Sequence, residues 1–311
     1  MVLSIQKINK AFKQKNKEIQ ANRDISFTVS EGEILGILGP NGAGKTTLIK
    51  QITNLLIPDS GKIFFKGGDV VKYPHILRGG CSLLLEGLRN IYPYLTGEAN
   101  LLYFAYLNHI TPALAKERSI KLLKQMGLYE VKNKYSFEYS SGMNRKLAIA
   151  TCLINEPELV ILDEPTSGLD VVAVEDLISF IKELAKDKNK TFILVSHNMR
   201  FIEKVVERVI WMRNGLIWMD KKVEEIKNTL KNKEILISVR DSPDVKTFLS
   251  KNNLPFTYIG SSIIRVVLNI TIHKEFLSEL LSSFEVLNIE KQDSDFEFIF
   301  KELYNETYNK S

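Results

Sequence analysis

The stretch GPNGAGKT at residues 39–46 constrains the fold of this chain more than any other feature of its sequence. It fits the pattern G-x-x-x-x-G-K-[ST] in full. The apolar run EILGIL precedes it, as in a strand buried on both faces, and KTTLIKQITNLL follows it with apolar residues at helical spacing. Glycines let a backbone curl until successive N–H groups face a phosphate, and a helix N-terminus adds a positive field. The sequence therefore predicts a phosphate-binding loop between a strand and a helix.

The side chains of this loop predict how it holds a nucleotide. Lys45 is expected to reach the β- and γ-phosphates, Thr46 to bind Mg²⁺ through its hydroxyl, and Thr47 to add a second hydroxyl donor. A plain glycine-rich turn does not account for a lysine followed by two threonines. The other positions are expected to bind nucleotide chiefly through their backbone: Gly39, Pro40, Asn41, Gly42, Ala43 and Gly44.

Two later apolar runs end in groups that suit phosphate chemistry. LVILDEP, residues 159–165, contains Asp163 and Glu164, and TFILVSHN, residues 191–198, contains His197. A helical pattern separates the runs, which predicts a parallel sheet whose strands end at one common edge. Asp163 is expected to hold the metal ion. Glu164 is expected to be the general base toward water, unless it is a strand-end charge or helix cap, and His197 to contact the γ-phosphate, unless it is a structural histidine.

A second stretch, YSSGMNRKLAIA at residues 139–150, also suits an anion. Ser140, Ser141 and Gly142 stand directly before a helical pattern, which is how a chain prepares a helix N-terminus for a negative group. An ordinary helix cap is the alternative interpretation of the same residues. The stretch lies about a hundred residues after the phosphate-binding loop, so the sequence raises the question of why one chain carries two such sites.

The remaining patterns predict additional layers around the parallel sheet. Residues 1–30 alternate apolar and polar side chains, which predicts antiparallel strands. Residues 97–138 form a helical insertion with Pro112 between two helices. The dipeptide Asn214-Gly215 between two apolar runs predicts a hairpin without evident chemistry of its own.

We expect two domains in this chain. Residues 1–225 form an α/β P-loop NTPase core with the antiparallel subdomain and the helical insertion. Residues 226–311 begin within a Lys-rich helical linker, and residues 234–311 give the pattern strand, helix, strand, helix, strand. This pattern predicts a small α+β accessory domain over residues 226–311.

Composition excludes several functional classes. The net charge is +5 without a dense block of lysine or arginine, so charge alone does not favour nucleic-acid binding. The two cysteines, Cys81 and Cys152, have no metal-ligand spacing and are expected to be small buried residues in a reducing cytoplasm. No segment approaches the roughly 20 apolar residues that cross a bilayer, and the N-terminus lacks the apolar region of a secretory signal.

The order of the motifs GPNGAGKTT, YSSGM, LVILDEP, SGLD and SHN resembles the nucleotide-binding subunit of an ATP-binding cassette (ABC) transporter over roughly residues 1–225. The resemblance implies ATP and Mg²⁺ as ligands. It implies that Phe12 stacks on adenine, although Phe12 is equally consistent with a core residue of its strand, and that Asp170 couples two nucleotide sites. In this family the signature stretch binds the ATP held by a second subunit, so Ser140, Ser141, Gly142 and Met143 are expected to act across a dimer.

Two departures from the family pattern concern these sites. The signature is usually Leu-Ser-Gly-Gly-Gln, whereas this chain has Tyr139, Ser141 and Met143 at the first, third and fifth positions. Glu86 occupies the place of a lid-loop glutamine that contacts Mg²⁺ and the attacking water. A carboxylate keeps an oxygen ligand but loses the amide donor, so Glu86 is expected to be both a metal ligand and a catalytic residue.

The stretch LEGLRNIYPYLTGEANLLYF resembles the corresponding sequence in the cassette subunits of ABC-2 type exporters of antibiotics, bacteriocins and drugs. The resemblance implies an ATPase that dimerises on ATP at the cytoplasmic face of the membrane and powers a separate integral membrane permease. Tyr92 and Tyr94 are candidate permease contacts, or else core residues. The alternatives are an importer ATPase, a soluble cassette ATPase acting on nucleic acid or ribosomes, and a small-molecule kinase, against which the signature stretch argues. Nothing in the sequence names the cargo.

Overall fold

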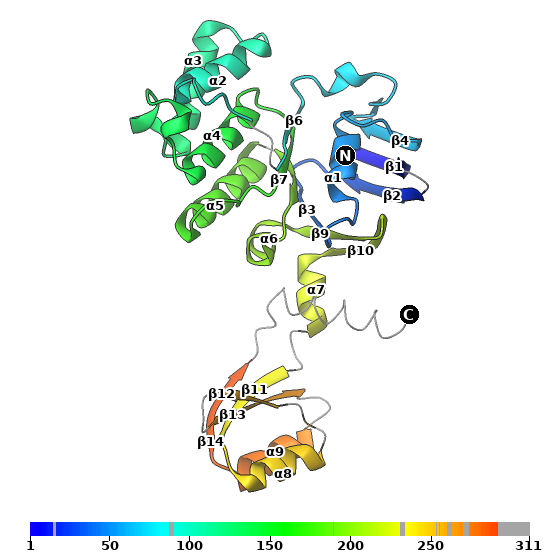
Figure 1. Ribbon diagram of the computed structural model, residues 1–311, viewed down its shortest axis with the longest axis vertical. Helices are drawn as coiled ribbons and strands as arrows, with labels where there is room; N and C mark the ends of the chain where they lie inside the picture. The colour runs from blue at the N-terminus through cyan, green and yellow to red at the C-terminus, as the bar shows by residue number, and fades with distance from the viewer. Residues whose placement is uncertain are drawn as a thin grey trace. The chain divides into compact units, whose positions relative to one another are not determined.

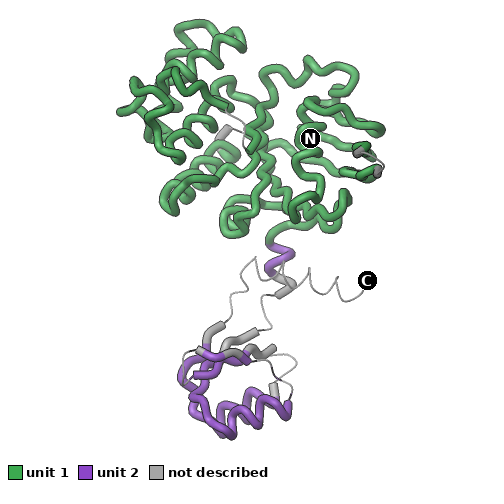
Figure 2. The backbone as a smooth tube through the Cα atoms, in the orientation of Figure 1, with its two compact units in different colours: residues 1–223 green, residues 224–311 purple. Residues whose placement is uncertain are grey.

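The chain forms two compact units, residues 1–223 and residues 224–311 (Figure 2). The computed structural model describes residues 1–14, 17–86, 90–188, 190–230, 234–252, 254, 256–259, 263–269 and 274–291. Each unit has its own apolar core. No helix within these described ranges combines the length and apolar character that a bilayer crossing needs.

A six-stranded sheet forms the centre of the first unit, in the order β10-β9-β3-β8-β7-β6 (Figure 1). The five strands from β9 to β6 are parallel, and β10 runs antiparallel to β9 at one edge. Every residue of β3, β7 and β8 is buried, which explains their continuously apolar sequences. The strands are β3 (Ile34–Leu38), β6 (Cys81–Leu84), β7 (Leu159–Asp163), β8 (Thr191–Val195), β9 (Arg208–Arg213) and β10 (Leu216–Lys222).

Three helices follow the parallel strands. Helix α1 (Lys45–Ile52) follows β3, α5 (Val171–Lys188) connects β7 to β8, and α6 (Met199–Val205) connects β8 to β9. Such crossover connections place the loops that follow β3, β7 and β8 at one edge of the sheet. This edge is where the sequence predicts the phosphate-binding groups.

An antiparallel sheet with the strand order β2-β1-β4-β5 lies beside the first, as the alternation in residues 1–30 predicts. Apolar residues of both sheets share one core, in which Ile5, Ile25 and Ile63 pack with Ile37 and Ile161. The antiparallel strands are β1 (Leu3–Gln14), β2 (Lys17–Val29), β4 (Ser60–Phe65) and β5 (Gly68–Asp69).

The helical insertion forms a lobe around α2 (Gly97–Leu107) and α3 (Pro112–Gln125), next to α4 (Ser141–Leu153) (Figure 1). The Thr96 side chain caps α2 by accepting from Ala99 N at 3.1 Å, and Pro112 begins α3. The buried Asn100 side chain donates to the Tyr92, Leu95 and Thr96 carbonyls and so fixes the segment before α2. Single-turn helices cover Tyr129–Val131 and Ser136–Glu138, and a further one covers Pro74–Leu77.

The hairpin of β9 and β10 turns at Asn214 and Gly215, whose φ angles are 50° and 74°. Two consecutive positive φ angles are what a tight two-residue hairpin requires, so this prediction is confirmed. The turn also contacts the phosphate-binding loop, which its sequence does not indicate. Gly215 N donates to the carbonyl of Ala43 in the phosphate-binding loop at 3.2 Å, and Arg23 N donates to Gly215 O at 2.7 Å.

The second unit begins within α7 (Val223–Leu230) and contains a four-stranded antiparallel sheet in the order β12-β13-β11-β14. Two helices complete a β-α-β-β-α-β topology of the ferredoxin-like type. The sequence predicted three strands, and the structure adds β12, whose four residues are too few to show a period. The elements are β11 (Glu234–Arg240), α8 (Pro243–Lys251), β12 (Phe256–Ile259), β13 (Ile263–Asn269), α9 (Lys274–Ser283) and β14 (Val286–Lys291).

Candidate nucleotide site

The loop between β3 and α1 depends on its glycines for two different reasons. Gly39 and Gly44 have φ angles of 145° and 99°, and a Cβ atom on either would lie 2.1 Å from a backbone oxygen, that of Met212 or Ala21. These two glycines are therefore required by packing. Gly42 has a φ angle of 79°, but a Cβ atom there would meet nothing within 4 Å. Its side of the loop is open to a ligand.

Lys45 lies along the inside of this loop. Its Nζ donates to the carbonyls of Gly39 at 2.7 Å and Pro40 at 3.0 Å. Burial lowers the pKa of Lys45, while Glu164, Asp163 and Glu86 act against that shift, so the ammonium lies among three carboxylates. Gly44, the N-cap residue of α1, offers no side-chain acceptor, which leaves the first N–H groups of α1 for another acceptor.

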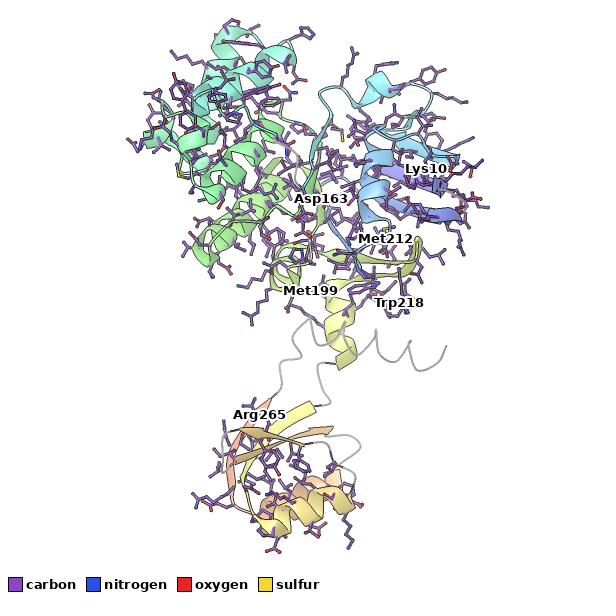
Figure 3. All side chains as sticks on the ribbon, in the orientation of Figure 1. Lys10, Asp163, Met199, Met212, Trp218 and Arg265 are labelled. Atoms are coloured by element: carbon purple, nitrogen blue, oxygen red, sulfur yellow. The ribbon has the colours of Figure 1, made fainter. Side chains whose placement is uncertain are left out.

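Asp163 ends β7 and is 4% exposed, in the middle of the first unit (Figure 3). The pKa of Asp163 is raised to about 6, chiefly by burial. A hydrogen bond from the Glu86 backbone and the charge of Lys45 act against this shift, and the charges of Glu164 and Glu86 add to it. A buried carboxylate with this surplus of negative neighbours is a site where a cation is favoured.

Glu164 follows Asp163, and its carboxylate is held at both oxygens. Ser196 Oγ donates to Oε2 at 2.9 Å, and His197 N donates to Oε1 at 2.9 Å. The Nδ1 atom of the His197 ring lies 2.7 Å from the same Oε1. The Glu164 side chain is 8% exposed and that of His197 is 84% exposed, so the histidine ring lies between the glutamate and the solvent.

The backbone of Glu164 is held as firmly as its carboxylate. Its φ angle of 50° is uncommon for a residue other than glycine. Its N–H donates to Val195 O at 2.7 Å, and its carbonyl accepts from Arg145 Nη2 at 2.6 Å and Ser167 N at 3.2 Å. The sequence patterns do not predict roles for Arg145 or Ser196. Ser196 could have been found, since it precedes His197 at the same strand end, but no spacing marks Arg145.

The residues present fit a Mg²⁺ ion that arrives with a phosphate. Thr46 is exposed at the start of α1 and Asp163 supplies a carboxylate, which are oxygen donors of the kind that Mg²⁺ prefers. Within the described part of the chain, no three acidic, histidine or cysteine side chains converge as a metal site by themselves. The Glu86 side chain is exposed, and it is the Glu86 backbone that contacts Asp163. The metal-binding and catalytic roles of Glu86 stay predictions.

The signature residues form the N-terminus of α4. Ser140 Oγ caps the helix by accepting from Met143 N at 3.2 Å, and Ser141 Oγ donates to Gly168 O at 3.5 Å. A Cβ atom on Gly142 would lie 3.1 Å from that same oxygen. Ser140 and Ser141 are exposed. Across the described residues, no hydrogen bond joins positions 140–143 to positions 39–47, so the chain does not bring its own two anion-binding stretches together.

Tyr139, the departure at the first signature position, has a packing role. Its hydroxyl donates to Val131 O at 2.8 Å, and burial raises its pKa. A Cβ atom on Gly97 would lie 2.3 Å from the hydroxyl oxygen. The tyrosine therefore ties the start of α4 to the helical lobe, which a leucine could not do by hydrogen bonding.

Phe12 and Asp170 lie in environments that bear on their predicted roles. Phe12 on β1 is 41% exposed, so it is not a core residue of its strand, and Lys10 Nζ lies 5.8 Å from its ring centroid. Lys10 marks the antiparallel sheet in Figure 3. Asp170 Oδ1 accepts from Ala173 N at 2.8 Å and so caps α5. Adenine stacking by Phe12 and coupling by Asp170 stay predictions.

Comparison with known proteins gives consistent matches to one family. The family model described as ABC transporter matches residues 22–167. The ABC transporter ATP-binding protein NatA of Bacillus subtilis is 35% identical over 214 residues, 69% of this chain and 87% of NatA. The methionine import ATP-binding protein MetN 1 of Oenococcus oeni is 31% identical over 229 residues, 72% of this chain and 65% of MetN 1. The doxorubicin resistance ATP-binding protein DrrA of Mycobacterium tuberculosis is 32% identical over 237 residues, 75% of this chain and 70% of DrrA.

The structure also resembles solved cassettes. The dimeric post-hydrolysis state of the ATP-binding cassette MJ0796, bound to ADP and Pi, matches with a TM-score of 0.65 at 25% identity. The match covers 71% of this chain and 98% of that one. The predicted fold class, an α/β P-loop NTPase core, is thereby confirmed.

Proposed function

This chain belongs to the family of ABC transporter ATP-binding proteins and is an ATPase; from that premise we propose that it binds Mg²⁺·ATP at residues 39–47 and powers a separate membrane permease. The observation that carries the proposal is the Glu164 carboxylate, which is buried at the end of β7 next to Asp163 and held by Ser196 and His197. A carboxylate placed in this way can accept a proton from a water molecule.

Each group at the site has a proposed part in hydrolysis. The loop N–H groups and Lys45 bind the phosphates, and Thr46 and Asp163 would hold Mg²⁺, which offsets the negative charge of the phosphates. Glu164 takes the proton of the attacking water. His197 orients the Glu164 carboxylate and presents its exposed ring to the γ-phosphate. Phe12 is exposed on β1, where a ring can stack on adenine.

We further propose that two such subunits share their nucleotide sites. Ser140 and Ser141 are exposed at a helix N-terminus that makes no hydrogen bond to the phosphate-binding loop of its own chain within the described residues. A second subunit can supply the missing half of each site. The dimeric form of the cassette MJ0796 supports this arrangement. The partner subunit is a second copy or a related cassette, and no nucleic acid is expected.

The permease contact is proposed for an aromatic groove on the helical lobe. The groove has a volume of about 790 Å³, and we define it by Pro93, Tyr94, Phe137, Ser141, Asn144 and Arg145. Tyr94 is 81% exposed and Phe137 58% exposed, and their ring centroids lie 5.9 Å apart. Exposed aromatic pairs of this kind are typical of protein interfaces and are unusual on free surfaces. Tyr94 is thus a proposed contact residue and not a core residue.

The direction of transport is proposed to be export. The stretch LEGLRNIYPYLTGEANLLYF resembles ABC-2 type exporters, and DrrA, named for doxorubicin resistance, is similar over 75% of the chain. The cargo would then be an antibiotic, peptide, lipid or drug-like compound, and the chain would act at the cytoplasmic face of the membrane. MetN 1 is named for methionine import, so an importer is the second candidate.

The test is to capture the partner. A tagged Glu164→Gln chain is expressed in its native host, membranes are solubilised in detergent with ATP, and co-purifying proteins are identified. We expect a polytopic membrane protein. The same chain with Tyr94→Ala and Phe137→Ala added is the control, and it should dimerise on ATP but lose the membrane protein. Recovery of ribosomal or DNA-bound material in place of a membrane protein would contradict the transporter function.

A further inference from the structure

Arg145 connects the signature helix to the backbone of the proposed general base. It lies on the second turn of α4, and its Nη2 atom donates to the Glu164 carbonyl at 2.6 Å. The two residues belong to different elements, since Glu164 follows β7 in the central sheet. Hydrogen bonds with a charged donor are shorter and roughly twice as strong as neutral ones. This is therefore a strong contact between α4 and the loop that carries Glu164.

The Glu164 backbone needs such a contact because its conformation is strained. A φ angle of 50° costs a residue other than glycine about 1 kcal/mol, and it persists only where the surroundings hold it. The carbonyl of the strained residue accepts from both Arg145 and Ser167. The same conformation turns the side chain toward Ser196 and His197, whose contacts fix the carboxylate. If the Glu164 carbonyl lost these hydrogen bonds, its backbone could leave this conformation and the carboxylate would no longer point toward Ser196 and His197.

The electrostatic surroundings of Arg145 also place it close to the carboxylates of the nucleotide site. Burial lowers the pKa of Arg145, and the charges of Glu86, Glu164 and Asp163 raise it. The guanidinium thus lies within the field of the same three carboxylates that surround Lys45. Lys45 belongs to the phosphate-binding loop, however, whereas Arg145 reaches the site from α4.

We propose that Arg145 is a positioning residue for hydrolysis, which holds the Glu164 backbone in the left-handed conformation that aims its carboxylate. The inference rests on the proposed role of Glu164 as general base. It goes beyond that role, because it assigns a task in the chemical step to a side chain of α4. Arg145 does not contact the phosphate-binding loop through any hydrogen bond in the described residues, so its loss should spare ATP binding.

The position of Arg145 also offers a specific way to test it. Its side chain lines the aromatic groove, which is open to solvent. Truncating it to alanine would leave a guanidinium-shaped space next to the Glu164 carbonyl that a small cation can enter from the groove. Added methylguanidinium should then take the place of the missing guanidinium and restore hydrolysis. If the substitution acted only by destabilising the fold, methylguanidinium would not restore it.

The experiment measures ATP hydrolysis and ATP affinity of the full chain purified without a membrane partner, so that the groove beside Arg145 stays open to methylguanidinium. For Arg145→Ala we expect kcat to fall about 30-fold and KM for ATP to stay within about threefold, as for a misplaced reacting group. Added methylguanidinium should raise the kcat of Arg145→Ala several-fold above its value without the additive. Arg145→Lys should keep an intermediate kcat, since it retains the charge but not the planar fork. Lys146→Ala, which removes the neighbouring charge on α4, is the matched control and should keep kcat within about twofold.

Two results would overturn the proposal. One is an Arg145→Ala chain with parental kcat, and the other is a lost kcat that methylguanidinium does not restore while KM rises. Glu164→Gln, measured alongside, separates the two levels of inference. If Glu164→Gln abolishes hydrolysis and Arg145→Ala does not, only the role of Arg145 is wrong, whereas a parental rate in Glu164→Gln contradicts the general base and the inference together. If Arg145→Ala does not fold, Arg145→Gln takes its place, with the same expected loss of kcat at unchanged KM.

Discussion

The His197 ring and the Glu164 carboxylate meet at a single oxygen, with Nδ1 2.7 Å from Oε1, and the His197 backbone N–H donates to that oxygen at 2.9 Å. One residue therefore holds the carboxylate twice, once by its backbone and once by its ring. With Nδ1 directed at Glu164, Nε2 lies on the other side of the exposed ring and is available to a ligand.

Replacing His197 by alanine should slow hydrolysis without preventing ATP binding. The variant loses the ring but keeps the backbone N–H and Ser196 as partners of Glu164, so we expect kcat to fall about 10- to 100-fold and ATP affinity to change by less than about threefold. Steady-state kinetics with a binding titration checks this. Asn198→Ala is the control, because it removes the cap of α6, costs about 1 kcal/mol of stability and leaves both Glu164 contacts in place. A His197→Ala chain that hydrolyses ATP at the parental rate would remove the histidine from the mechanism.

Two glycines of the loop should respond in opposite ways to alanine. Gly44→Ala places a Cβ atom 2.1 Å from Ala21 O, so we expect it to destabilise the fold by about 3 kcal/mol or more. Gly42→Ala meets nothing within 4 Å and should cost only about 1 kcal/mol for its positive φ angle. The added methyl group stands on the open side of the loop, however, and should weaken ATP binding at least about tenfold. Thermal unfolding and nucleotide titration of both variants separate the effects, and equal affinities for Gly42→Ala and parent would show that phosphate lies elsewhere.

The stability of the nucleotide-free protein should depend on pH through Asp163. Burial raises the pKa of Asp163 to about 6 from an ordinary value of 3.8, so the folded chain holds this proton more tightly than the unfolded chain. The free energy of unfolding should therefore fall as pH rises from about 4 to about 6, by at most about 3 kcal/mol.

Asp163→Asn should remove this pH dependence. At pH 7.5 without nucleotide it should unfold at a temperature several degrees above the parent, because a buried charge is gone. With Mg²⁺·ATP the order should reverse, since the metal ligand is lost. Unfolding temperatures measured from about pH 4 to about pH 8, with and without nucleotide, check both statements. A variant that shows the parental slope between pH 4 and 6 would exclude Asp163 as its cause.

Both cysteine thiols should resist alkylation in the folded chain. Burial raises the pKa of Cys81 and of Cys152 to about 12, and free thiols ordinarily titrate near 9. At pH 8 the thiolate fraction is then lower by about 1,000-fold. Mass spectrometry after iodoacetamide treatment should show modification at least about 100-fold slower in the native protein than in urea. Fast labelling of Cys152 without unfolding would contradict the packing of α4 against β6.

Tyr139 and Gly97 should be energetically coupled. Tyr139→Phe loses the hydrogen bond to Val131 and should cost about 1 kcal/mol. Gly97→Ala forces a Cβ atom to within 2.3 Å of the Tyr139 hydroxyl and should cost more. In the double variant the hydroxyl is absent, so its cost should be smaller than the sum of the two. Chemical unfolding of the four chains measures this coupling, and simple additivity would mean that the two residues do not touch.

The parts of the fold with strong local patterns were predictable from sequence. The glycine loop, the buried strands that end in Asp163 and near His197, and the Asn214-Gly215 hairpin each carry their information in a few consecutive residues. The patterns did not predict β12 or β6, because four-residue strands are too short to show a period. The role of Phe12, adenine stacking or core packing, was ambiguous for a related reason. An alternating pattern does not say which face of a strand is covered by the rest of the protein.

The contacts that position Glu164 were not predictable. Arg145 binds a backbone carbonyl 19 residues away, and every residue type offers such a carbonyl, so the sequence contains no sign of the pairing. Ser196 reaches Glu164 across 32 residues through the adjacency of β7 and β8, which only the folded sheet establishes. The signature stretch could be recognised by resemblance. Only the folded structure, however, shows that it lies apart from the phosphate-binding loop of its own chain.

The support that Gly215 gives to Ala43 sets a limit on when the loop can form during synthesis. The loop belongs to the first 50 residues, yet its carbonyl at Ala43 and its neighbour Gly39 are held by the hairpin strands that follow residue 207. A ribosome must therefore release some 170 further residues before the phosphate-binding backbone is complete. A chain that stops before β9 lacks both Met212 and Gly215, so we expect its phosphate-binding loop to be less ordered and its affinity for nucleotide to be lower.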